Sequence, residues 1–184
     1  MRALVAYGSA NGSTKEIAEV LAVSIAESGP DVDLRSVEDV ATLAGYDAVV
    51  LGSPVHNGAW LPEVHEFCRD QRLPLRQRRV WLFSVGAVGA TTSAYGPRSS
   101  SVLRKLRREP RSVLELRRNL EPQDHHAFAG VLDADRWGRM ASLNFRLLGG
   151  TWGDHRDWDD VRRWGATIGT ALSQPGSSTG TTPG

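Results

Sequence analysis

The chain has 184 residues, enough for one domain with a substantial apolar core. Its 22 basic and 21 acidic side chains leave a net charge of +1, so overall charge gives no attraction to nucleic acid. The single cysteine, Cys68, excludes an internal disulfide and fits a reducing cytoplasm. No apolar run approaches the roughly 20 residues of a membrane span, and a strand expected from residue 2 leaves no room for a signal peptide.

Predicted strands and helices alternate along the chain, judged from the spacing of apolar residues. Buried strands are predicted at 2–7, 46–52, 79–85 and 126–131, and a strand with one wetter face, suited to a position nearer the sheet edge, at 32–37. Helices are predicted at 14–28, 62–71, 138–148 and 157–172, with a basic helical region at 98–118 that Pro110 interrupts. Residues 174–184 are predicted to be a disordered polar tail, which leaves 1–173 as the domain.

This alternation predicts an α/β fold with a five-stranded, doubly wound parallel sheet and helices on both faces. In such folds ligands bind at the carboxyl ends of the strands, near the point where the strand order reverses. Three of the predicted strands end in unusual loops, which we expect to converge on one crevice.

The first loop, residues 8–14, reads G-S-A-N-G-S-T and leads into the first helix. Its two glycines permit a tight turn that presents backbone N–H groups, and the positive end of the helix points to the same place. A Walker A loop needs four residues between the glycines and a lysine after the second, and the fingerprint G-x-G-x-x-G is also absent. A phosphate held by hydroxyls and amides without a lysine suits a monophosphate such as that of FMN. The residues predicted to hold it are Ser9, Ala10, Asn11, Gly12, Ser13 and Thr14.

Residues 7–14, Y-G-S-A-N-G-S-T, resemble the phosphate loop of flavodoxins, which commonly reads Y-G-S-x-T-G-N-T. Asn11 stands where the family usually has threonine, which removes one hydroxyl and keeps a polar side chain. The resemblance implies the flavodoxin-like strand order 2-1-3-4-5 and FMN as the cofactor. The alternative is an ordinary Gly/Ser turn between a strand and a helix.

The second loop, residues 52–60, follows the third strand, and its Gly, Pro and Asn-Gly shape an irregular backbone. In flavodoxin-like proteins the matching loop packs against the isoalloxazine ring. Trp60 could stack on that ring or anchor the loop on the adjacent helix, and His56 could donate to the flavin or a substrate or have no such duty. The residues that the resemblance places beside the ring are Ser53, Pro54, His56, Asn57 and Trp60.

The third loop, residues 86–96, follows the fourth strand, and its small residues permit close approach of a ligand. Gly86, Ala87 and Tyr95 are predicted to contact the cofactor, with Tyr95 either at the pyrimidine edge of the flavin or packed on the protein surface. His125 and His126 stand at a strand entrance, away from the crevice, and are expected to be structural. No nucleophile and no metal ligands are expected.

The carboxyl half resembles the menaquinone-dependent protoporphyrinogen oxidase family. The matching segments are F-A-G-V-L at 128–132, the glycine pair at 149–150, D-H-R at 154–156 and the Asp-Trp pair that opens the last helix, together with T-K-E-I-A at 14–18. This resemblance covers residues 2–172 and implies an oxidoreductase that acts on protoporphyrinogen with a quinone acceptor. The second loop departs from it: where the family tends to have S-I-R-Y-G, this chain reads S-P-V-H-N-G, so His56 stands near the place of the arginine.

Residues 98–118 carry eight basic and two acidic side chains, a local charge of +6, interleaved with apolar residues. The segment could be a solvated helix face, could approach the anionic inner face of a membrane, or could attract the carboxylates of a porphyrin. No nucleic-acid-binding motif accompanies it. The predicted location is therefore cytoplasmic, with peripheral membrane contact through 98–118 as one alternative.

Taken together, the sequence predicts an FMN-dependent oxidoreductase of protoporphyrinogen and a quinone. The alternative is a flavodoxin-type electron-transfer protein with a protein redox partner and no small-molecule substrate. Such carriers are usually strongly acidic, whereas this chain is nearly neutral. A third class, a binding module that has kept the fold and lost the flavin, conflicts with the nearly complete phosphate loop.

Overall fold

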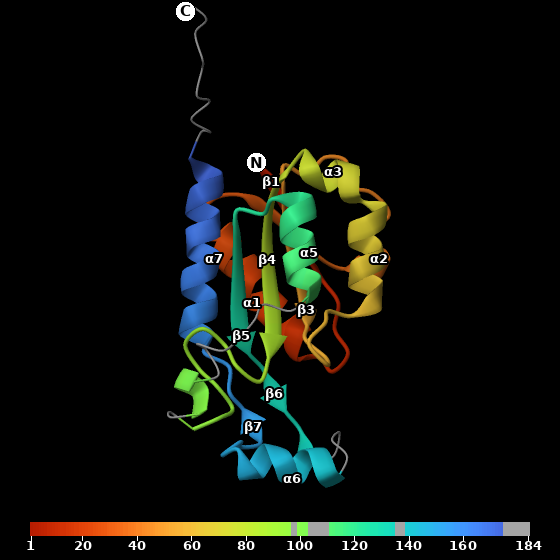
Figure 1. Cartoon of the computed structure of the whole chain (residues 1–184). Helices are drawn as coiled ribbons and strands as arrows, with labels where there is room; N and C mark the ends of the chain where they lie inside the picture. The colour runs from red at the N-terminus through yellow and green to blue at the C-terminus, as the bar shows by residue number, and fades with distance from the viewer. Residues whose placement is uncertain (97–98, 103–110, 135–138, 175–184) are drawn as a thin grey trace, which may run out of the picture.

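The computed structural model describes residues 1–96, 99–102, 111–134 and 139–174. A parallel sheet in the order β2-β1-β3-β4-β5 forms its centre (Figure 1), which confirms the predicted sheet and strand order. The strand predicted to be wetter, β2, lies at one edge of the sheet and is only partly buried. The strands are β1 (Arg2–Tyr7), β2 (Asp31–Ser36), β3 (Ala48–Pro54), β4 (Arg79–Gly86) and β5 (Asp124–Ala129).

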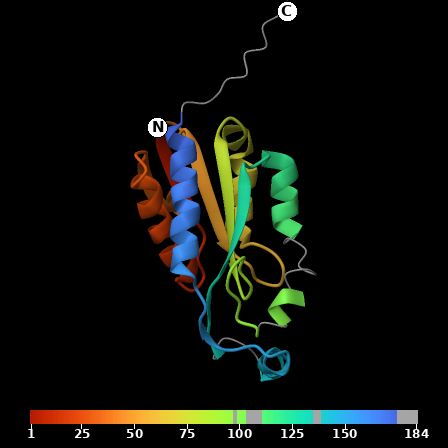
Figure 2. The same ribbon diagram turned by 90° about the vertical axis from the view of Figure 1, so that its left-hand side faces the viewer.

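Helices cover both faces of the sheet (Figure 2). One face carries α1 (Ser13–Ala26) and α7 (Trp158–Ser173), and the other carries α2 (Pro62–Asp70), α3 (Arg72–Arg76) and α5 (Arg111–Leu120). The helices predicted at 14–28, 62–71 and 157–172 are confirmed to within two residues, whereas α3 and the short 3₁₀ helix η1 (Val37–Asp39) were not predicted. Of the basic region predicted at 98–118, residue 98 and residues 103–110 lie outside the described residues, as do residues 175–184 of the predicted tail.

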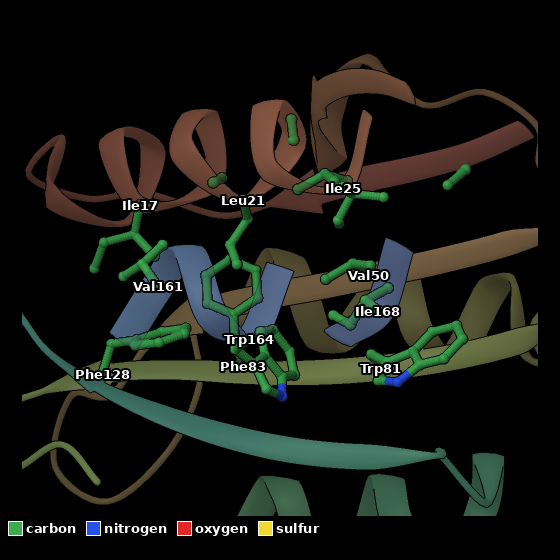
Figure 3. Packing of buried hydrophobic residues seen from close by; sticks show 14 of the residues in the cluster. Ile17, Leu21, Ile25, Val50, Trp81, Phe83, Phe128, Val161, Trp164 and Ile168 are labelled. Carbon is green, nitrogen blue, oxygen red and sulfur yellow. The ribbon is translucent and has the colours of Figure 1, made fainter. Parts of the chain in front are cut away.

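Alternation along β1 builds a core on each side of the sheet, because successive side chains of a strand point to opposite faces. Ala3 and Val5 pack under α1 and α7, whereas Leu4 and Ala6 pack under α2 and α5. Figure 3 shows the first core, in which Leu21 of α1 and Trp164 of α7 lie over Phe83 of β4. Cys68 is buried in the second core.

A small lobe extends the molecule beyond the carboxyl ends of the strands (Figure 1). It consists of β6 (Val131–Leu132), α6 (Arg139–Leu147) and β7 (Gly153–Asp154), with β6 and β7 paired antiparallel. We call residues 131–134 and 139–154 the β6–α6–β7 lobe. The helix predicted at 138–148 is confirmed, but the strand predicted at 126–131 is wrong in its bounds: β5 begins two residues earlier, and Gly130 separates it from β6.

None of the helices in the described ranges combines the length and apolar character that crossing a bilayer requires.

Candidate functional site

Residues 8–14 form a tight turn between β1 and α1. Gly12 has a φ of +86°, a conformation that side chains with a β-carbon rarely adopt. Its N–H donates to Ser9 Oγ across 3.0 Å, which closes the turn. The N-cap residue of α1 is Gly12 itself, which has no side chain that could accept from the first N–H groups of the helix. The first N–H groups of a fourteen-residue helix are thus left for another acceptor, and an anion suits them.

Close packing behind this turn fixes its position. A β-carbon on Gly8 would stand 2.4 Å from Cγ2 of Val64 in α2, so only glycine fits there. Thr14 is buried at the start of α1, and Ser13 Oγ accepts a hydrogen bond from the Val131 N–H across 3.3 Å. The atom nearest to the β-carbon position of Gly12 is Glu16 Oε1, at 3.9 Å, which is an ordinary van der Waals contact. The backbone of this loop therefore turns tightly just before the N-terminus of α1, where helix N–H groups can hold an anion.

The second loop is a two-residue turn on a buried base. His56 and Ala59 exchange backbone hydrogen bonds of 2.9 and 3.0 Å, and Asn57 and Gly58 between them have positive φ values of 50° and 77°. His56 and Asn57 are exposed at the tip of the loop. These two predicted site residues can therefore reach a ligand outside the protein surface.

Two other residues predicted to border the ring lie beneath this loop. Ser53 is fully buried, and its hydroxyl accepts from the Leu61 N–H across 3.0 Å and donates to the Pro54 carbonyl across 2.9 Å. Trp60 is 3% exposed and donates from Nε1 to Ser84 Oγ across 2.8 Å. Of the two alternatives for Trp60, the structure shows the loop anchor, since a ring this deeply buried offers no face for stacking.

The third loop is held against the carboxyl-terminal part of the chain. Thr92 Oγ1 donates to the His155 carbonyl across 2.6 Å, and the Thr151 N–H donates to the Ala94 carbonyl across 2.8 Å. Tyr95 forms an isolated bridge to Gly150. These contacts join residues more than fifty positions apart, so no local sequence pattern predicts them.

Tyr95 is half-buried between its loop and α6. Its ring meets the edge of Phe145, with the ring centroids 5.0 Å apart. Burial raises the pKa of Tyr95 above its ordinary value of 10.0, so the hydroxyl stays protonated as a donor at neutral pH. The packing of Tyr95 on α6 matches one of its two predicted alternatives, and the part of the ring that remains exposed leaves the other open.

An open cavity of about 600 Å³ lies between the third loop and β7. Most of its lining side chains carry hydroxyls, and the charged side chains of Asp154 and Arg156 also line it. The lining residues are Thr91, Thr92, Ser93, Tyr95, Ser100, Asp154, His155 and Arg156. Polar cavities of this size suit a ligand with several hydrogen-bonding groups.

Arg156 joins this cavity to the phosphate loop. Its Nε and Nη2 donate to the two carboxylate oxygens of Asp154 across 2.9 and 2.6 Å, and its Nη1 pairs with Glu16 in the first turn of α1. The guanidinium also lies over the Trp158 ring, 4.4 Å from its centroid. These hydrogen bonds hold the pKa of Asp154 below its ordinary value and raise that of Arg156. Arg156 belongs to the D-H-R segment noted in the sequence, but its pairing with Glu16 could not be predicted there, because the two residues lie 140 positions apart.

The two histidines stand near the start of β5, as predicted, and have protein partners. His125 Nε2 lies 2.9 Å from Ser84 Oγ, and His126 Nε2 lies 2.9 Å from Asp160 Oδ2. The His126 ring also packs against Trp164. Both side chains thus join β5 to neighbouring elements.

The strand ends that carry these loops are adjacent. The Gly8 N–H donates to the Gly52 carbonyl across 3.0 Å, and the Gly130 N–H donates to the Gly86 carbonyl across 2.9 Å. The strand order reverses between β1 and β3, the point at which open α/β sheets bind ligands. Together these features define a doubly wound α/β protein with a glycine-containing turn and a helix N-terminus at the switch point of its sheet.

The chain belongs to the flavodoxin domain family, whose model matches residues 4–158. Among characterised proteins it is similar to protoporphyrinogen IX dehydrogenase [quinone] of Escherichia coli strain K12, with 23% identity over 186 aligned positions. That alignment covers 95% of this chain and 98% of the relative.

Solved structures share the fold at low identity. A flavodoxin from the domain Archaea superposes with a TM-score of 0.54 at 17% identity, covering 95% of this chain and all of the other. The rubredoxin oxygen:oxidoreductase of Desulfovibrio gigas superposes with a TM-score of 0.57 at 18% identity over 93% of this chain. This chain spans 36% of that protein's length.

Proposed function

We propose that this protein binds FMN at residues 8–14 and works as an FMN-dependent oxidoreductase. The observation that carries the proposal is the α1 N-terminus, whose N-cap residue is Gly12, a residue without a side chain and with a positive φ. Such a terminus binds phosphate through backbone N–H groups and the helix dipole. Ser9, Ala10, Asn11, Gly12, Ser13 and Thr14 would hold the phosphate.

The loops after β3 and β4 would border the flavin ring. His56 and Asn57 are exposed at the tip of the second loop, next to Pro54, and Gly86, Ala87 and Tyr95 lie in the third loop. When bound, FMN supplies the ability to accept electrons from one partner and pass them to another. The protein's own groups would orient the ring, donate hydrogen bonds and exclude water, so no side-chain nucleophile is required.

For the substrates we propose protoporphyrinogen as the electron donor and a quinone as the acceptor. The likeness to protoporphyrinogen IX dehydrogenase [quinone] over 95% of the chain supports this pair. The hydroxyl-lined cavity beside Tyr95 and Arg156 offers polar groups for a substrate next to the proposed ring site. We propose a cytoplasmic location for this reaction, and membrane contact through residues 98–118 would give access to a quinone in the bilayer.

The test is an anaerobic absorption titration of the purified chain. FMN is added and the excess removed, after which protoporphyrinogen and menaquinone are added in turn. We expect retained flavin bands that bleach with porphyrinogen and recover with quinone. Retained FMN that ignores porphyrinogen would instead favour electron transfer to a protein partner, and protein that retains no flavin would contradict the cofactor assignment.

A variant of the loop locates the cofactor. Thr14 is 2% exposed, so Thr14→Trp cannot place its ring without displacing the start of α1. We expect the folded variant to lose FMN retention, whereas His65→Trp, a change to the same residue at a partly exposed position on α2, keeps it. Full flavin content in Thr14→Trp would contradict the site.

A further inference from the structure

Two carboxylates approach the glycines of the proposed phosphate loop. Glu16 Oε1 lies 3.9 Å from the point where a β-carbon on Gly12 would stand, and Glu63 Oε1 lies 3.8 Å from the same point on Gly8. A carboxylate beside an anion site opposes the binding of a phosphate dianion. A site that takes phosphate therefore needs a means of offsetting these charges.

Arg156 supplies a positive charge at Glu16. Its Nη1 pairs with Glu16 Oε2, while its remaining donors hold both oxygens of Asp154. The side chain is 10% exposed and lies over Trp158, so the guanidinium is fixed from several sides. Lys15, the neighbouring cation on α1, pairs with Glu19 across 3.8 Å.

We propose that Arg156 is a positioning residue for the FMN phosphate: its guanidinium, shared between Glu16 and Asp154, offsets part of the Glu16 charge and holds that carboxylate at the side of the loop. This inference rests on the proposed function, because it concerns how the same loop tolerates a phosphate. The arginine acts through Glu16 and leaves the N–H groups of α1 free to contact the ligand. Its effect is therefore specific to the phosphate and independent of the flavin ring.

Riboflavin, which lacks the phosphate, provides the discriminating probe. Dissociation constants of FMN and riboflavin are measured by quenching of flavin fluorescence, with the full chain and with Arg156→Gln. We expect the FMN constant to rise about fivefold, the size of a partly exposed charge interaction, and the riboflavin constant to stay unchanged. The FMN effect should shrink as salt is added.

Removing the opposing carboxylate should cancel the defect. We expect Glu16→Gln to restore FMN affinity in the Arg156→Gln background. Glu63→Gln is the matched control: it removes a carboxylate at the same loop that does not pair with Arg156, and its effect should be the same with and without Arg156. If Arg156→Gln does not fold, Arg156→Lys replaces it in the test. Lysine keeps the positive charge but cannot make the bidentate contact of a guanidinium, so we expect a smaller loss that is again specific to FMN.

Equal loss of FMN and riboflavin affinity would mean that Arg156 only supports the fold, and would overturn the inference. Failure of Glu16→Gln to restore binding would overturn it as well. If the wild-type protein binds FMN and Arg156→Gln binds it equally well, this inference alone is contradicted. Wild-type protein that binds no FMN contradicts the proposed function, and the inference is then overturned with it.

Discussion

The indole N–H of Trp60 donates to the hydroxyl of Ser84 across 2.8 Å, inside the core beneath the second loop. His125 Nε2 lies 2.9 Å from the same oxygen. One hydroxyl on β4 thus connects the loop after β3 to β5. The second loop therefore stands on a fixed polar contact, and its exposed tip projects from a rigid base.

Replacing Trp60 by Phe tests this anchor. The variant loses the hydrogen bond and part of a buried ring, so we expect the free energy of unfolding to fall by about 1–3 kcal/mol. FMN affinity should change by less than about twofold, because the indole ring of Trp60 contacts the core and not the proposed ligand site. Urea unfolding and a flavin titration measure the two quantities. A folded Trp60→Phe protein with a tenfold weaker FMN affinity would revive the stacking alternative.

Gly12 offers a test that separates backbone strain from ligand binding. Gly12→Ala places a β-carbon at a φ of +86°, which costs about 1–2 kcal/mol of stability. Gly45 has a φ of +83° with open space around it, so Gly45→Ala carries the same strain far from the phosphate loop. We expect similar losses in the free energy of unfolding for both variants and a loss of FMN affinity for Gly12→Ala alone.

The readout for this pair is thermal or urea unfolding together with FMN binding. Equal FMN affinity in the two alanine variants would show that the turn at Gly12 does not present the N–H groups to a phosphate.

Asp160 connects α7 to the third loop and to β5. It is buried, and its Oδ2 lies 2.9 Å from His126 Nε2 and accepts from Thr91 Oγ1 across 3.2 Å. We expect Asp160→Ala to lower the free energy of unfolding by about 1–3 kcal/mol, since it removes a buried carboxylate that is hydrogen-bonded to His126. The exposed neighbour Asp159 pairs only at the surface with Arg162, so Asp159→Ala should cost less than about 1 kcal/mol. Urea unfolding of both variants makes the comparison, and equal losses would contradict a structural role for the buried carboxylate.

Asp33 should make stability depend on pH at the acid end. The Tyr46 hydroxyl donates to its carboxylate across 2.6 Å and Arg2 pairs with it across 2.7 Å, and these contacts hold the pKa of Asp33 below its ordinary value of 3.8. A lowered pKa stabilises the fold at pH values above 3.8, and that contribution is lost as the pH falls below 3.8 through the folded-state value. The difference in unfolding free energy between wild type and Asp33→Asn should therefore be full at pH 6 and shrink toward pH 3. A difference that grows on acidification would contradict this assignment.

The regular elements could be predicted because their apolar periodicity is local. The bounds of β1 and the start of α2 at Pro62 agree with the sequence expectation, since each depends on a few neighbouring residues. The start of β5 could not be found this way. Its polar residues Asp124, His125 and His126 look unlike a buried strand, and their partners, among them Ser84 and Asp160, lie at least 34 positions away in sequence.

In the candidate site, too, features that depend on neighbouring residues could be predicted, whereas features that depend on residues distant in sequence could not. The phosphate loop depends on glycines and hydroxyls within seven consecutive residues, so its shape could be anticipated. The burial of Trp60 could not, because it depends on Ser84, which belongs to another strand. Two-residue strands such as β6 and β7 have no periodicity to detect.

The β6–α6–β7 lobe leaves the main body at Gly130 and returns at His155, where the His155 N–H donates to the Gly130 carbonyl across 3.3 Å. The two ends of the lobe therefore lie side by side, so the lobe is a segment inserted at one point of the main body. Evolution can lengthen, shorten or exchange such a segment at small cost to the sheet, because loop closure depends only weakly on length. Since the lobe also touches Tyr95 through Phe145, its exchange would alter what reaches the third loop while the phosphate loop stays constant. The part of the lobe that is free to diversify therefore lies between its ends, because Val131 donates to Ser13 of the phosphate loop and Asp154 holds Arg156.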